Sequence, residues 1–162
     1  MKKGYLGVML DCSRNAVMSV AELKNFILML KKTGYNCLQL YTEDTYEIEG
    51  EPQFGYRRGK YTKAELKEID AFAKKNGVEL MPCIQTLAHL NQIFRYPKYQ
   101  KINDANDILL VDDERTYELI EKMIATCAEC FTSRNIHIGM DEAHMLGRGR
   151  YYDLYGRVRI LL

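Results

Sequence analysis

The chain has 162 residues, of which 47% are hydrophobic, and its 23 basic and 22 acidic residues leave a formal net charge of +1. This size and composition suffice for one sizeable core, so we expect a single domain over residues 1–162. The balanced charge predicts no nucleic-acid or membrane partner, and the longest apolar runs are too short to span a bilayer.

The five cysteines, an odd number, stand at apolar positions, as is typical of proteins from a reducing compartment. The apolar stretch after Met1-Lys2-Lys3 runs directly into Asp11 without a cleavage-like site. It therefore indicates a first strand rather than a signal peptide, and we expect a cytoplasmic protein.

The first half of the chain alternates strand and helix patterns. Residues 5–10 form a continuous apolar run, typical of a strand covered on both faces. Ser19 and Glu22 have the spacing of a capping box at the start of a helix, and residues 37–41 read as the second strand.

The alternation continues to residue 139. Thr62 and Glu65 form a second capping box, and residues 78–84 read as the third strand. Asp113 can cap a further helix, and residues 135–139 complete a fourth strand. The inner face of that last helix is expected to carry Tyr117, Ile120, Ile124 and Cys127.

Four strand–helix units in a row predict an α/β fold with a parallel sheet. The loops that follow strands are long, at residues 42–61 and 85–111, whereas the loops that follow helices are short. This asymmetry favours a (β/α) TIM-type barrel over a flavodoxin-like open sheet. Because a full barrel needs roughly 250 residues, we expect only about its first four units, a half-barrel.

The most informative segment is His137-Ile138-Gly139-Met140-Asp141-Glu142, an apolar strand that ends on two adjacent carboxylates. Like charges at the end of a buried strand are costly, and proteins tolerate that cost where it performs chemistry. Polar groups also follow the three earlier strands. They are Arg14 after the first, Glu43 and Asp44 after the second, and His89 after the third. We therefore expect a catalytic rim.

These residues resemble glycoside hydrolase family twenty, the β-N-acetylhexosaminidases. His137, Gly139, Asp141 and Glu142 match the family's His-x-Gly-x-Asp-Glu segment. The similarity extends over roughly residues 4–147. Arg14, Thr42-Glu43-Asp44 and His89 fall where the family has polar segments after its first three strands. The chain departs from the family pattern at Met140, at Leu87-Ala88, at Gln85 and in having no tryptophan.

The resemblance implies a retaining, substrate-assisted hydrolysis that needs no cofactor and no metal. Glu142 would be the general acid and base, and Asp141 would hold the acetamido nitrogen. Arg14 would bind hydroxyls of the terminal sugar. His89, Asp44 and His137 would support the carboxylates from behind.

Three interpretations remain open at this point. The first is the amino-terminal half of an exo-acting enzyme that removes N-acetyl-β-glucosamine or galactosamine from glycans or glycoconjugates, with weak or no activity of its own. The second is a non-catalytic half-barrel whose exposed edges form a homodimer. The third is a barrel hydrolase that uses two carboxylates in the ordinary way.

Overall fold

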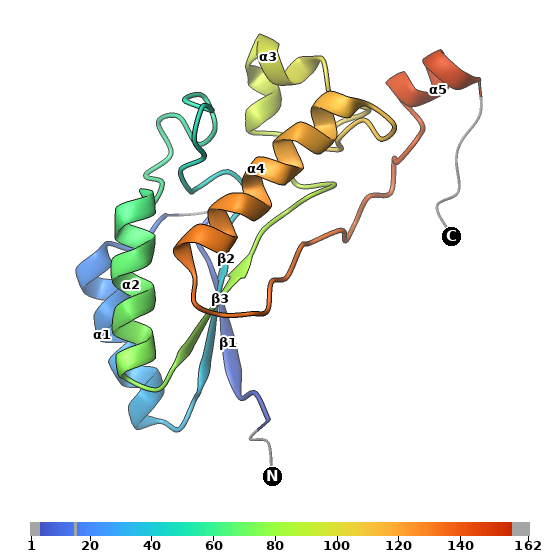
Figure 1. Ribbon diagram of the computed structural model, residues 1–162. Coiled ribbons are helices and arrows are strands. Elements are labelled where there is room, and N and C mark those ends of the chain that lie inside the picture. Colours follow the sequence, from blue (N-terminus) through green and yellow to red (C-terminus); the bar gives the residue numbers. More distant parts are fainter. Residues whose placement is uncertain (1–3, 15, 157–162) are drawn as a thin grey trace.

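The computed structural model describes residues 4–14 and 16–156 of the chain. Helices lie along one face of a small twisted sheet, and the chain from the end of the longest helix runs back past the sheet to a short helix set apart from it (Figure 1). The elements in chain order are β1 (Gly7–Asp11), α1 (Val20–Lys32), β2 (Cys37–Tyr41), α2 (Lys63–Lys75), β3 (Glu79–Cys83), η1 (Ile93–Arg95), α3 (Pro97–Gln100), α4 (Glu114–Cys130) and α5 (Arg150–Tyr155).

The sheet is parallel with strand order β1-β2-β3, as the alternating pattern predicts. In its register Asp11 pairs with Tyr41, and Tyr41 pairs with Cys83. The three strands therefore end level with one another. The loops that follow them leave the sheet from the same edge, and this alignment brings the candidate site residues together.

The helix starts follow the predicted capping residues. Thr62 and Glu65 form a complete capping box on α2. Ser19 accepts a hydrogen bond from the N–H of Glu22 at 3.3 Å on α1, which is one half of the predicted box. Asp113 caps α4 by accepting from the N–H of Arg115 at 3.0 Å.

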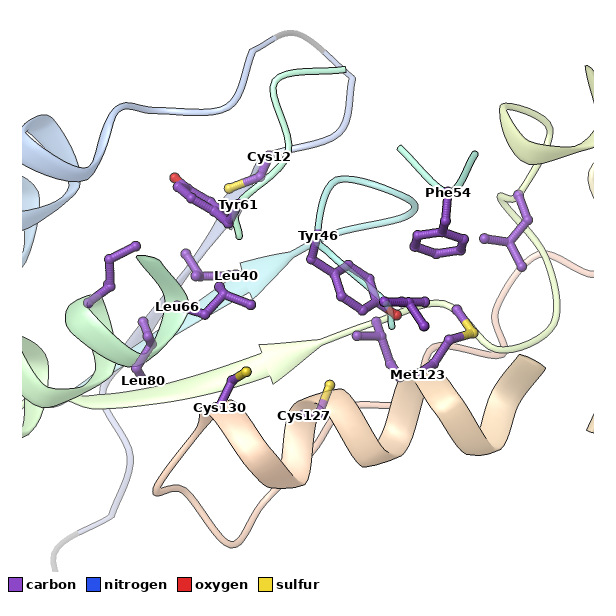
Figure 2. Packing of buried hydrophobic residues seen from close by; sticks show 14 of the residues in the cluster. Cys12, Leu40, Tyr46, Phe54, Tyr61, Leu66, Leu80, Met123, Cys127 and Cys130 are labelled. Carbon is purple, nitrogen blue, oxygen red and sulfur yellow. The ribbon is translucent and has the colours of Figure 1, made fainter. Parts of the chain in front are cut away.

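The main core lies between the sheet and the helices. Leu38, Leu40 and Leu80 point from the strands toward α1 and α2, where Leu23, Ile27, Leu66 and Ile69 are fully buried. Figure 2 shows the far end of this core, where Tyr46 and Phe54 from the loop after β2 meet Met123 and Cys127 of α4. The loop after β2 is thus part of the core, and this holds it in place over the strand ends.

Three sequence predictions need correction. The first strand is not covered on both faces, because Val8 and Leu10 face the core whereas Met9 is 50% exposed. The predicted inner face of α4 is confirmed at Cys127, which is buried, and at Ile120, which packs against the core, but the buried face is centred on Leu119 and Met123. Tyr117 and Ile124, which the prediction placed inside, are exposed. An apolar stripe one residue to either side has the same helical period, so only packing against α2 and the loop after β2 distinguishes them.

The predicted fourth strand, residues 135–139, is not a full strand. It lies beside β3 through one parallel bridge between His137 and Cys83. The His137 N–H donates to Pro82 O at 3.0 Å, and His137 O accepts from Ile84 N–H at 2.9 Å. Within the described part of the chain no strand pairs with the other side of this segment, and Gly139 turns it away with a φ of 55°. A segment that is hydrogen-bonded to a neighbour on one side only is less stabilised as a regular strand.

A search of the described residues finds no helix with the length and apolar character needed to cross a membrane.

One buried carboxylate ties the long loop after β2 to two helices. Glu51, 2% exposed, accepts hydrogen bonds from Tyr99 Oη at 2.7 Å and from Lys122 Nζ at 2.7 Å, and also from Lys98. Burial raises the pKa of Glu51, but the bonds from Lys122, Lys98 and Tyr99 outweigh it, so the net pKa lies below its ordinary value. The folded state therefore prefers the ionised form.

We predict that Glu51→Gln lowers the free energy of unfolding at pH 7 by about 2 kcal/mol, because charge-assisted hydrogen bonds are lost. Since the folded pKa is depressed, this contribution is present above the carboxyl's ordinary pKa and is lost as the pH falls below it, so wild type and variant should converge at acid pH. Urea unfolding at several pH values measures both effects. Glu68→Gln, which removes an exposed pair with Lys24, is the control and should change little.

Candidate active site

The two adjacent carboxylates lie at the rim of the sheet and face solvent. The sequence pattern suggested that both carboxylates are buried, and this is wrong. The side chain of Asp141 is 57% exposed and that of Glu142 is 66% exposed. Glu142 has a φ of 56°, a left-handed conformation that costs a non-glycine residue about 1 kcal/mol or more. The backbone there is held in an unfavourable conformation that aims the Glu142 carboxylate toward His89.

The turn before the carboxylates requires glycine. Gly139 has a φ of 55°, and a Cβ at this position would lie 2.4 Å from Ile84 O and 2.6 Å from the Gln85 side chain. The backbone of this segment therefore comes closer to the loop after β3 than any side chain would permit. Steric clash thus explains why the His-x-Gly-x-Asp-Glu segment has glycine at this position.

His89 lies between the two carboxylates and the rest of its own loop. Its Nε2 is 3.5 Å from Asp141 Oδ2 and 3.5 Å from Glu142 Oε2. A proton on Nε2 would face both anions at once and offset their mutual repulsion. The structure thus brings together three of the predicted site residues, from the loops after β3 and after residue 139.

Gln85 connects these residues to the next strand end. Its Nε2 donates to Asp141 Oδ1 at 3.3 Å and to Tyr41 Oη at 3.2 Å. Burial raises the pKa of Asp141, but its own N–H, the Gln85 amide and the His89 imidazole together bring the net pKa below the ordinary value. Asp141 therefore stays an anion, the form that can accept an N–H donor from a ligand.

Arg14 stands at the other end of the same rim. Its guanidinium pairs with Asp11 at 3.1 Å, lies 5.0 Å from the centroid of the Tyr41 ring, and is 3.9 Å from Glu43 Oε1. Glu43 in turn accepts from Ser13 Oγ at 2.7 Å and from Tyr41 Oη at 3.2 Å. A partly exposed guanidinium oriented by two carboxylates can donate to neutral hydroxyls of a ligand.

Asp44 and His137, also predicted for the site, have other surroundings. Asp44 is buried and pairs with Arg58 at 3.2 Å, and Arg58 also donates to Ser13 O at 2.7 Å. Burial raises the pKa of Asp44 more than the Arg58 charge lowers it. His137 is exposed, and its Nδ1 accepts from the Gly139 N–H at 3.2 Å, which helps to form the turn before the carboxylates.

The loop that bears the carboxylates is anchored by Asp104. This buried side chain accepts from Gly147 N–H at 2.6 Å and from Tyr151 N–H at 2.8 Å, and its carbonyl accepts from Arg150 N–H at 3.0 Å. A small apolar cluster adds to the anchor, in which Leu87, Ala88 and Ile108 pack against Ala143 and Leu146. The long loop after β3 therefore fixes the segment that follows Asp141 and Glu142, through the apolar cluster at Ala143 and Leu146 and through Asp104 at Gly147 and Tyr151.

Sequence reasoning missed Asp104 and Asp107, the carboxylates of this long loop. Both lie near the end of residues 85–111 rather than directly after a strand, and no motif marks them. Gln85 and Tyr41 lie at strand ends, so their position there was a usable signal for the bridge that they form.

The described residues hold no group of three or more His, Cys, Asp or Glu side chains arranged for a metal ion. Cys127 and Cys130 are buried in α4 as free thiols. Burial raises the pKa of the Cys12 thiol to about 12 and that of Cys83 to about 11, so both remain protonated.

Comparison with known families now adds to this geometry. The family described as "Glycosyl hydrolase family 20, catalytic domain" matches residues 4–148, which is most of the chain and includes every residue of the rim. The chain belongs to glycosyl hydrolase family 20.

Similar proteins and structures agree with this membership. Hexosaminidase D of Homo sapiens is 25% identical over 140 residues, which cover 84% of this chain and 29% of that protein, and hexosaminidase D of Bos taurus is 25% identical with 40% of its length covered. The family 20 β-N-acetylhexosaminidase of Streptomyces coelicolor A3(2) superposes with a TM-score of 0.78 at 27% identity, over 97% of this chain and 37% of that one. A mutant Streptomyces plicatus β-hexosaminidase, in complex with its product GlcNAc, gives a TM-score of 0.79 at 27% identity.

The chain thus spans well under half the length of these relatives, and its parallel α/β sheet corresponds to part of a family 20 TIM-type barrel.

We predict that Asp104→Asn loosens the carboxylate loop, because an amide nitrogen in place of one carboxylate oxygen faces a backbone N–H and cannot accept from it. The Gly147 and Tyr151 amides should exchange with solvent about tenfold faster or more, measured by hydrogen exchange and NMR. The control is Asp153→Asn on the exposed side of α5, which should leave both rates unchanged. Unchanged exchange in Asp104→Asn would contradict the anchoring role.

Proposed function

We propose that this chain carries the acid–base half of a family 20 active site, which hydrolyses terminal N-acetyl-β-hexosaminides. The observation that carries the proposal is the position of His89 Nε2, 3.5 Å from both Asp141 and Glu142, on the rim to which Gln85 and Tyr41 also connect Arg14. Family membership supplies the reaction class, and the geometry suggests which residue does what.

In this mechanism the 2-acetamido oxygen of the sugar attacks C1, and an oxazolinium ion forms as the glycosidic bond breaks. Glu142, the more exposed carboxylate, protonates the leaving oxygen and later takes a proton from the attacking water, so that configuration is retained. Asp141 remains an anion and accepts the acetamido N–H, where it stabilises the positive charge that develops on nitrogen.

Arg14 is proposed to bind hydroxyls of the terminal sugar. Its guanidinium is more than half exposed and is oriented by Asp11 and by the face of Tyr41, which leaves donors for a ligand. Asp44 is proposed to orient Arg58, which in turn holds Ser13 beside Arg14 at the end of β1. His137 is proposed to shape the Gly139 turn.

We further propose that residues 4–148 form the first four β/α units of the family barrel. The parallel register, the long loops after β2 and β3, and the likeness to the Streptomyces coelicolor structure over 97% of this chain support this assignment. The five buried thiols, none in a disulfide, support the proposal of a reducing, cytoplasmic environment.

The proposed activity is tested with an aryl N-acetyl-β-glucosaminide beside the matching β-glucoside. We expect slow turnover of the acetamido substrate alone, because only that sugar supplies the internal nucleophile. Glu142→Gln should lower kcat by at least about 100-fold. Hydrolysis of both substrates at similar rates would favour an ordinary two-carboxylate mechanism and contradict this one.

A homodimer is a second proposal, supported by apolar side chains at both edges of the sheet. Met9 on β1 is 50% exposed, and Ile138 and Met140 beside β3 are 42% and 53% exposed. Apolar groups of this kind on incompletely paired edges favour association.

We predict concentration-dependent dimerisation in sedimentation equilibrium, weakened by at least about tenfold in Met9→Lys because a charge replaces apolar contact area. Leu28→Lys is the control, since Leu28 is an exposed apolar residue on α1, away from these edges. A chain that stays monomeric at high concentration, or equal weakening by both substitutions, would contradict dimerisation through the sheet edges.

A further inference from the structure

The backbone of His89 is held by a carboxylate of its own loop. His89 has a φ of 59°, which is unfavourable for a residue with a Cβ, and its N–H donates to Asp107 Oδ2 at 3.0 Å. The same oxygen lies 3.8 Å from His89 Nδ1. Asp107 therefore contacts both the main chain of His89 and one edge of its ring.

The opposite edge of the ring faces the candidate catalytic pair. Nε2 lies 3.5 Å from Asp141 and from Glu142, and within the described chain it has no hydrogen-bond partner although it is buried. The imidazole thus has one carboxylate at Nδ1 and two at Nε2.

Asp44, which the family resemblance offers as a support for the carboxylates, pairs with a different residue. It pairs with Arg58 at 3.2 Å, and Arg58 is fixed by Ser13 O at 2.7 Å and Ser13 Oγ at 3.0 Å. These contacts tie Asp44 to the loops after β1 and β2.

We propose that Asp107 is the positioning residue of His89, which fixes its backbone through the N–H and places a carboxylate at the Nδ1 edge of its ring. The catalytic meaning of this role rests on the proposed function, but the interaction itself does not. The ring held in this way keeps Nε2 3.5 Å from Glu142, within reach of the anion left on that carboxylate after it gives its proton to the leaving oxygen.

The proposal is tested by hydrogen exchange and NMR on the full chain labelled with ¹⁵N, with His89→Gln to assign the His89 signals. In Asp107→Ala the His89 N–H should exchange with solvent about tenfold faster or more, because its acceptor is removed. Asp107→Asn, whose amide oxygen can still accept, should restore most of the protection. It also provides a second variant if the first is poorly folded.

Asp44→Asn is the matched control, since it removes the carboxylate that pairs with Arg58 on the same rim and should leave the exchange of the His89 N–H unchanged. An equal or larger increase in Asp44→Asn, or unchanged exchange in Asp107→Ala, would overturn the assignment to Asp107. Where turnover is measurable, kcat should fall in Asp107→Ala and recover in Asp107→Asn. Because hydrogen exchange needs no turnover, an inactive chain would contradict the turnover expected above while the exchange rates still decide the role of Asp107.

Discussion

The site depends on the register of the parallel sheet, in which the last residues of the three strands pair with one another. Asp11, Tyr41 and Cys83 lie side by side across β1, β2 and β3, and the bridge from Cys83 to His137 extends the row to the next segment. Each residue that follows a strand end is therefore delivered to the same edge of the sheet. A slip of one residue would turn every strand side chain to the opposite face and break the row.

The long loop after β3 then sets the fine geometry. It carries His89 toward the carboxylates, and it holds their loop through Asp104 and the cluster of Leu87, Ala88 and Ile108. Because the loop makes these contacts with buried groups, it behaves as part of the core rather than as a free surface segment. The unfavourable backbone of Glu142 persists since its neighbours on both sides are fixed.

Electrostatics divides the rim into two parts joined by Gln85. At one end Arg14 balances Asp11 and lies near Glu43, and at the other His89 faces Asp141 and Glu142. Gln85 donates to both ends without adding a charge of its own. Because Gln85 is neutral, the charged groups at each end of the rim are determined only by their own neighbours. This suits an anionic Asp141 beside Glu142, the carboxylate that must exchange its proton.

Local sequence patterns predicted the strand–helix alternation, the capping residues Thr62 and Asp113, and the His-x-Gly-x-Asp-Glu segment that marks the family. These are local features, because periodicity, capping and turn chemistry act over a few residues. The buried face of α4, the single-sided pairing of residues 135–139 and the exposure of both carboxylates were decided by tertiary structure alone. So were the partners of His89 and Asp44. Asp107 lies 18 positions from His89 and Arg58 lies 14 from Asp44, with no periodic pattern to link them, so only the folded loops bring those charges within contact.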